Sequence, residues 1–142
     1  MGNQKIPAVG PRPSSAGSLT PAQMDLVIRS LPVQVSVMDE HGIVLYWHGD
    51  AFADCDPGYI GAHINDSHNS TSQQVIADME AAFRDGSRDE AVLRSIENDR
   101  LMLLRYTPLR DGDGAYLGMM ETMQDITDIV GMPREESALD WD

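Results

Sequence analysis

Three histidines in the first half of the chain are the side chains best suited to bind a metal ion or a small ligand. His63 and His68 stand five residues apart in a stretch without regular periodicity, and His48 ends a segment rich in β-forming residues. A neutral imidazole is a common metal ligand and a good hydrogen-bonding group. His63 and His68, with Asp66 between them, lack the compact spacing of a structural zinc site. The pattern therefore favours histidines in loops or in a pocket wall.

The other reactive residue types give no sign of catalysis. Cys55 is the only cysteine, and its acidic neighbours Asp54 and Asp56 disfavour the reactive thiolate. No serine stands in a nucleophile-elbow context, no pair of acids has a catalytic spacing, and the chain has no glycine-rich phosphate loop. We expect that the protein is not an enzyme.

Composition excludes several classes of partner. The 142 residues suit one domain, and 23 acids against 10 bases give a net charge of −13. Such a charge repels nucleic-acid phosphates and anionic lipid surfaces. No apolar stretch approaches the roughly 20 residues that span a bilayer, and one cysteine cannot form an internal disulfide. We therefore expect a cytoplasmic protein with neither a nucleic-acid nor a membrane partner.

The chain divides into four segments. Residues 1–18 are rich in glycine, proline and serine, which predicts a flexible arm. Residues 19–31 form a predicted flanking helix, in which Thr20 and Gln23 make a capping box around Pro21. Residues 32–130 form the predicted main domain, and residues 131–142 form an acidic tail.

The main domain is predicted to be α+β. Alternating or β-rich segments predict five strands, at residues 33–38, 43–48, 91–97, 101–109 and 116–126. Capping boxes at Ser70 and Gln73, or at Thr71 and Gln74, begin a helix that ends at Gly86. The order favours a five-stranded antiparallel sheet with helices on one face, and a pocket between the two layers.

The last strand offers two faces. Leu117, Met119, Glu121, Met123 and Asp125 share one face, while Met120, Thr122, Gln124 and Ile126 share the other. If the first face is buried, Glu121 needs a partner, and Arg105 on the neighbouring strand is favoured. If the second is buried, Thr122 and Gln124 can hydrogen-bond a ligand.

In this order of elements the chain resembles a PAS domain. The resemblance is carried by 31–33 (Leu-Pro-Val), 38–42 (Met-Asp-Glu-His-Gly), 58–61 (Gly-Tyr-Ile-Gly), 107–111 (Thr-Pro-Leu-Arg-Asp) and 125–127 (Asp-Ile-Thr). It is closer still to PAS domains attached to hemerythrin-like modules, through Arg105-Tyr106, Tyr116-Leu117-Gly118, Glu121, Gln124 to Thr127 and His68. The chain departs from those relatives at Ser67, where they have a cysteine, and at Asn69-Ser70, where they have two prolines.

The resemblance implies a sensory domain that binds a small ligand or cofactor and signals to a separate protein. Haem, held through His68 or His63, is one cofactor that it suggests, and with haem the domain would be a gas or redox sensor. The first helix suggests a homodimer, and the signal would leave through Asp125, Ile126 and Thr127. The alternative is a dimerisation or interaction module without a ligand. The candidate ligand-binding residues are His63, His68, His48, Arg105, Tyr106, Met120, Thr122 and Gln124.

Overall fold

The computed structural model describes residues 16–49 and 57–133. The helices are α1 (Pro21–Ser30), α2 (Ser70–Arg84) and two short 3-10 helices, η1 (Pro57–Tyr59) and η2 (Ile64–Ser67). The strands are β1 (Gln34–Asp39), β2 (Val44–His48), β3 (Ala91–Glu97), β4 (Arg100–Arg110) and β5 (Tyr116–Asp125). All five predicted strands are present, with ends that differ by one residue at most. Cys55 and most of the predicted arm and tail lie outside the described residues.

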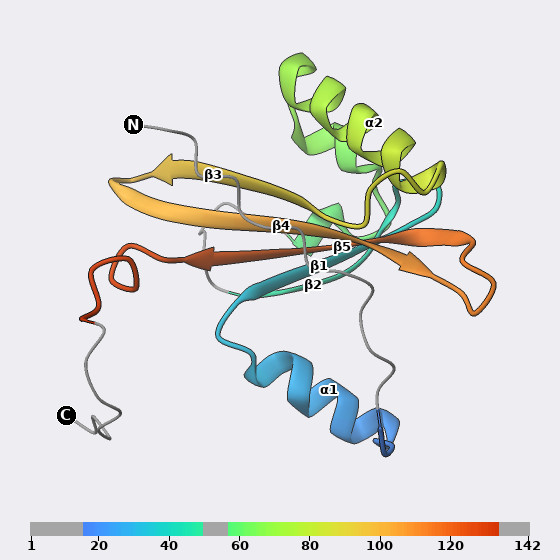
Figure 1. Ribbon diagram of the computed structural model, residues 1–142, viewed down its shortest axis with the longest axis horizontal. Coiled ribbons are helices and arrows are strands. Elements are labelled where there is room, and N and C mark those ends of the chain that lie inside the picture. Colours follow the sequence, from blue (N-terminus) through green and yellow to red (C-terminus); the bar gives the residue numbers. More distant parts are fainter. Residues whose placement is uncertain (1–15, 50–56, 134–142) are drawn as a thin grey trace.

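The five strands form one antiparallel sheet in the order β2-β1-β5-β4-β3. Figure 1 shows α2 on one side of this sheet and α1 on the other. The predicted α+β class is therefore confirmed, with the flanking helix separate from the helical layer. None of the described helices is long and apolar enough to cross a membrane.

Helix α2 supplies the main hydrophobic contact with the sheet. Its stripe of Ile76, Met79 and Phe83 packs with Met38 of β1 and Met119 of β5, all of them buried. Each such side chain contributes about 1.5–3 kcal/mol when it leaves water. This contact holds α2 firmly over one end of the sheet.

The beginning of α2 differs from the predicted capping box. Asn69 is the N-cap, and its side chain accepts a hydrogen bond from the backbone N–H of Ser72 at 3.0 Å. The Gln73 amide does not reach back to the cap. It donates instead to the carbonyls of Asn65 and His68, at 3.0 and 2.8 Å. Gln73 therefore connects the beginning of α2 to η2 and to His68, the predicted site residue that follows η2.

Helix α1 has the predicted start. Thr20 and Gln23 form the capping box, and the helix ends at Ser30, directly before Leu31 and Pro32. None of its residues is buried. Its contact with the main domain includes a bond between the Arg29 carbonyl and the His48 imidazole, at 3.1 Å. Its apolar residues are consequently left largely exposed to solvent.

Gly118 lets β5 approach β1 closely. It has φ of +145°, and a Cβ atom built there would lie 2.1 Å from the carbonyl oxygen of Met38. No other residue fits this position without moving one of the two strands. This close approach lies within the pairing of β1 with β5, and that pairing places the site residues described next.

Candidate functional site

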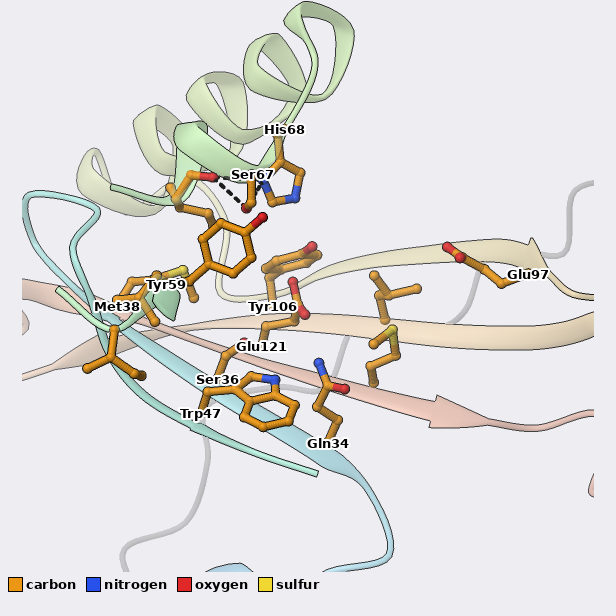
Figure 2. Close-up of a pocket in the computed structure, with 15 residues that line it drawn as sticks. Gln34, Ser36, Met38, Trp47, Tyr59, Ser67, His68, Glu97, Tyr106 and Glu121 are labelled. Atoms are coloured by element: carbon orange, nitrogen blue, oxygen red, sulfur yellow. Dashed lines mark hydrogen bonds between the residues drawn. The ribbon is translucent and has the colours of Figure 1, made fainter. Parts of the chain in front are cut away.

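A cavity of about 410 Å³ lies between the sheet and the short helices η1 and η2 (Figure 2). Strands β1, β2, β3, β4 and β5 all contribute side chains to it. The lining residues are Gln34, Ser36, Met38, Val44, Trp47, Tyr59, Ile60, Ile64, Ser67, His68, Glu97, Leu104, Tyr106, Glu121 and Met123. The mixture is mainly apolar with a few polar groups, which is typical of small-molecule sites.

The sheet wall of the cavity is a row of directly paired residues. Trp47 of β2 is paired with Ser36 of β1, Ser36 with Glu121 of β5, and Glu121 with Tyr106 of β4. Paired residues on antiparallel strands project to the same face. Four strands thus bring an indole, a hydroxyl, a carboxyl and a phenol side by side.

Tyr106 and Glu121 form the polar centre of this row. The Tyr106 hydroxyl lies near the Glu121 carboxyl group. Burial raises the pKa of Glu121, although the neighbouring Tyr106 hydroxyl and the proximity of His68 oppose this shift. Burial also raises the pKa of Tyr106, and the charge of Glu121 adds to that effect. The Glu121 carboxyl group therefore lies in a part of the cavity wall that disfavours its ionised form.

The predicted pair between Glu121 and Arg105 is wrong. Arg105 projects from the opposite face of the sheet, and its guanidinium bonds the Glu90 carboxylate at 2.8 Å. Adjacent residues on a strand face opposite ways, so Arg105 cannot share a face with its neighbour Tyr106. The partner of Glu121 is the tyrosine next to the residue that the sequence favoured.

His68 lines the cavity from the helical side. Its Nδ1 lies 2.8 Å from the carbonyl oxygen of Ile64 and 3.0 Å from Oγ of Ser67. A carbonyl oxygen only accepts, so the bond to Ile64 assigns the proton to Nδ1. In the neutral ring Nε2 is then an acceptor. The contact with Ser67 helps to hold the ring.

His63 and His48 lie outside the cavity lining. His63 is the N-cap of η2, and its Nδ1 accepts a hydrogen bond from the backbone N–H of Asn65 at 3.1 Å. Its Nε2 packs on Gly42, where a Cβ atom would lie 2.7 Å away. His48 bonds the Arg29 carbonyl on the other side of the sheet. Both rings therefore have structural contacts.

The remaining candidates gather on the face of the sheet away from the cavity. His48, Val35, Thr122 and Arg105 are paired in one row across β2, β1, β5 and β4. Met120 and Gln124 share the face of Thr122 because they alternate with the cavity residues Glu121 and Met123. Of the eight candidate residues, the cavity lining includes two, His68 and Tyr106.

Several of the lining residues that sequence reasoning missed are on β1 and β2. Gln34, Ser36 and Trp47 line the cavity, although the alternation in β1 marks its valines as the apolar face. Val35 is buried on the opposite face, with 3% of its surface exposed, and Gln34 is as well buried at 4%. In the sequence of β1, Gln34 and Ser36 alternate with valines. This alternation was the available sign that one face of the strand carries polar side chains.

The lining residues fit haem poorly. His68 offers one nitrogen that could bind iron, but haem also carries two propionates, which need cationic or strongly donating partners. No lysine or arginine is among the lining residues, all of which lie in the described ranges. Those ranges also contain no cluster of three or more His, Cys, Asp or Glu side chains suited to a metal ion. We derive no function through a metal or haem.

The side chain of Trp47, which lines the cavity, has a buried N–H group without a hydrogen-bond partner in the described part of the chain. The indole Nε1 of Trp47 is buried and has no acceptor among the residues that the structure describes. A buried N–H without an acceptor is unfavourable by about 1–3 kcal/mol.

The three predicted output residues are tied to the beginning of β4. Asp125 accepts hydrogen bonds from the N–H and hydroxyl of Thr127, at 3.0 and 2.7 Å. Thr127 Oγ1 in turn accepts the N–H of Leu101 at 2.8 Å, and the Ile126 N–H bonds the Leu101 carbonyl at 2.9 Å. Arg100 bonds Asp125 at 2.7 Å. These bonds fix the direction in which the chain leaves the sheet.

Comparisons with known proteins agree with this architecture. A family model described as "PAS domain" matches residues 24–127. The C-terminal domain of a Streptococcus mutans protein superposes with a TM-score of 0.73 at 21% identity, covering 84% of this chain and 94% of that one. A PAS domain from Colwellia psychrerythraea gives 0.57 at 15% identity, covering 75% and 97%.

A third solved structure with a similar fold comes from a signalling protein. The sensory box sensor histidine kinase from Vibrio cholerae superposes with a TM-score of 0.53 at 10% identity, covering 73% of this chain and 89% of that one. At these identities the structures show a shared fold. No curated protein sequence matches the chain.

Proposed function

The chain belongs to the PAS domain family, and from this premise we propose that it is a sensory domain whose cavity binds a small ligand. The observation that carries the proposal is the row of Trp47, Ser36, Glu121 and Tyr106, which sets polar groups into the wall of a cavity of about 410 Å³. The role is one of binding and not of catalysis.

The signal passes through β5 in this proposal. Glu121 and Met123 line the cavity, and the same strand ends at Asp125. A ligand changes the output only when it binds one arrangement of the sheet and the chain exit more tightly than another. A separate signalling protein then recognises the segment of Asp125, Ile126 and Thr127. The sensor histidine kinase from Vibrio cholerae has a similar fold, which supports such a role.

The flanking helix supports a homodimer. Met24, Val27 and Leu31 of the predicted apolar stripe are between 43% and 48% exposed, although they belong to an ordered, capped helix. A second copy of the chain would cover them, and most soluble oligomers are symmetric dimers. The same observation supports the second candidate function, an interaction module that dimerises without binding a ligand.

Methionine methyl NMR tests the ligand site directly. Met38 and Met123 line the cavity, whereas Met24 and Met132 are exposed at 48% and 65% and serve as internal controls. The protein, labelled with ¹³C at methionine methyls, is titrated with a set of soluble amines, alcohols, carboxylic acids and nitrogen heterocycles. The proposal expects saturable shifts of Met38 and Met123 only. If no compound moves these two signals, or if all four move together, the cavity is not the binding site.

A further inference from the structure

We propose that the ligand is an organic ammonium ion, meaning a protonated amine on a compact, mainly apolar body. This inference rests on the proposed function, because it names the chemical class that the cavity takes. Three properties of the cavity wall support it: the sign of its charged groups, its aromatic side chains and the hydrogen-bonding state of His68.

The charged side chains that line the cavity are both acids. They are Glu121, beside Tyr106, and Glu97, which lies toward the other end of the cavity (Figure 2). Lysine and arginine are absent from the lining, which falls wholly within the described ranges. An anionic ligand would meet a carboxyl group in a poorly solvated wall with no fixed cation to offset its charge. A cation, by contrast, forms an ion pair there with Glu121.

Aromatic rings surround the carboxyl group. Trp47, Tyr59 and Tyr106 all line the cavity, and Figure 2 shows Glu121 among the three rings. The faces of tryptophan and tyrosine rings attract ammonium groups, most strongly where water is excluded. The same rings also provide the apolar surface against which the body of the ligand packs.

His68 completes the polar wall as an acceptor. Its Nδ1 proton is used on the Ile64 carbonyl, so Nε2 of the neutral ring can accept an N–H from the ligand. Glu121 also accepts when it is ionised. An ammonium group has three N–H donors and no acceptor, so its needs match these two groups.

Calorimetric titration with three compounds of similar size and different charge tests the inference. The compounds are 2-phenylethylamine, which is cationic at neutral pH, 2-phenylethanol, which is neutral, and 3-phenylpropionate, which is anionic. We expect the amine to bind at least tenfold more tightly than the alcohol, and the acid to bind most weakly. Glu121→Gln keeps the shape of the side chain and should abolish the preference for the amine. Asp113→Asn removes one charge from an exposed turn and should leave the preference intact.

The outcomes separate the ligand class from the binding function. If the alcohol binds as tightly as the amine, or if Glu121→Gln keeps the tenfold preference, the ammonium assignment is overturned while the cavity remains a binding site. If none of the three binds but the methyl titration finds other ligands, again only the ammonium class is rejected. If the methyl titration also finds none, the proposed function is rejected with it.

Discussion

Tyr106 of β4 and Glu121 of β5 are directly paired, and both side chains line the cavity. This pairing places an acid in the wall of a cavity where burial raises its pKa. The ionised form of this carboxyl group is consequently disfavoured unless a ligand stabilises its charge, and protonation removes that charge.

Glu121→Gln should make the ligand-free protein more stable at high pH. A carboxyl group whose pKa is raised by folding contributes stability below its unfolded pKa, near 4.5, and that contribution is lost as the pH rises through the folded value. Each unit of elevation corresponds to about 1.4 kcal/mol. Glutamine keeps a polar side chain of the same shape beside Tyr106 but has no charge to bury.

Chemical denaturation of the two proteins between pH 4 and pH 8 measures this difference. The free energy of unfolding of Glu121→Gln should exceed that of the wild type at pH 8, and the gap should close toward pH 4. The exposed acids titrate equally in both proteins and cancel. A gap that is independent of pH would show that the Glu121 carboxyl is not penalised by burial.

Gly118→Ala should destabilise the fold by about 2 kcal/mol or more, because the added Cβ meets the Met38 carbonyl oxygen and the backbone φ is positive. Gly112→Ala is the matched control. Its Cβ would have no neighbour within 4 Å, so its effect should stay within about 0.5 kcal/mol. Thermal unfolding of both variants measures the two effects. Equal stabilities would mean that β1 and β5 do not approach as described.

Arg100→Ala should raise the pKa of Asp125. The hydrogen bond from Arg100 is the largest of the causes that lower this pKa to about 2, and those from Thr127 remain in the variant. A carboxyl group with a lowered pKa contributes stability above its unfolded value and loses it as the pH falls. The stability difference between wild type and variant should therefore shrink below pH 4.

Carboxyl ¹³C NMR of Asp125 follows this titration residue by residue. Asp85, whose pKa is lowered by bonds from Ser87, is the control that should not change. An unchanged Asp125 titration in Arg100→Ala would show that the bond between β4 and the chain exit does not persist in solution.

Val27→Glu should weaken the proposed homodimer at least tenfold. Val27 is 48% exposed in the single chain, so a charge there costs little unless a partner covers it. Ile96→Glu places the same charge on β3 at a residue that is 76% exposed, and it should leave the dimer intact. Light scattering over a range of concentrations measures both. Dissociation by Ile96→Glu alone would place the contact on the sheet instead of α1.

The positions of the strands could be predicted because each follows a local pattern of alternating or β-branched residues. The face that each strand turns toward the helices could not. Gln34 and Val35 are adjacent and about equally buried, so neither face of β1 is clearly the solvent side. The face of the sheet that is turned toward the helices decides whether Glu121 or Thr122 meets the cavity, since both are paired with residues of β1.

The site was predictable only in part for a related reason. The sequence identifies Glu121 as an acid that needs a partner if its face is buried, but Arg105 and Tyr106 are adjacent and differ only in the direction in which they project. The same limit applies to His63 and His68. His63 packs against Gly42, which is distant from it in the sequence but close in the fold, and the sequence alone does not show that contact.

Native mass spectrometry of freshly purified wild type and Ser36→Phe, with Ser36→Ala as the control, tests the central claim most directly. Phenylalanine at position 36 would fill the middle of the cavity, whereas alanine keeps it open. We predict that wild type and Ser36→Ala carry a small molecule that denaturation releases, and that Ser36→Phe lacks it while keeping the same oligomeric state. A wild-type protein that is an empty dimer, or one whose bound mass persists in Ser36→Phe, would contradict a ligand site in this cavity.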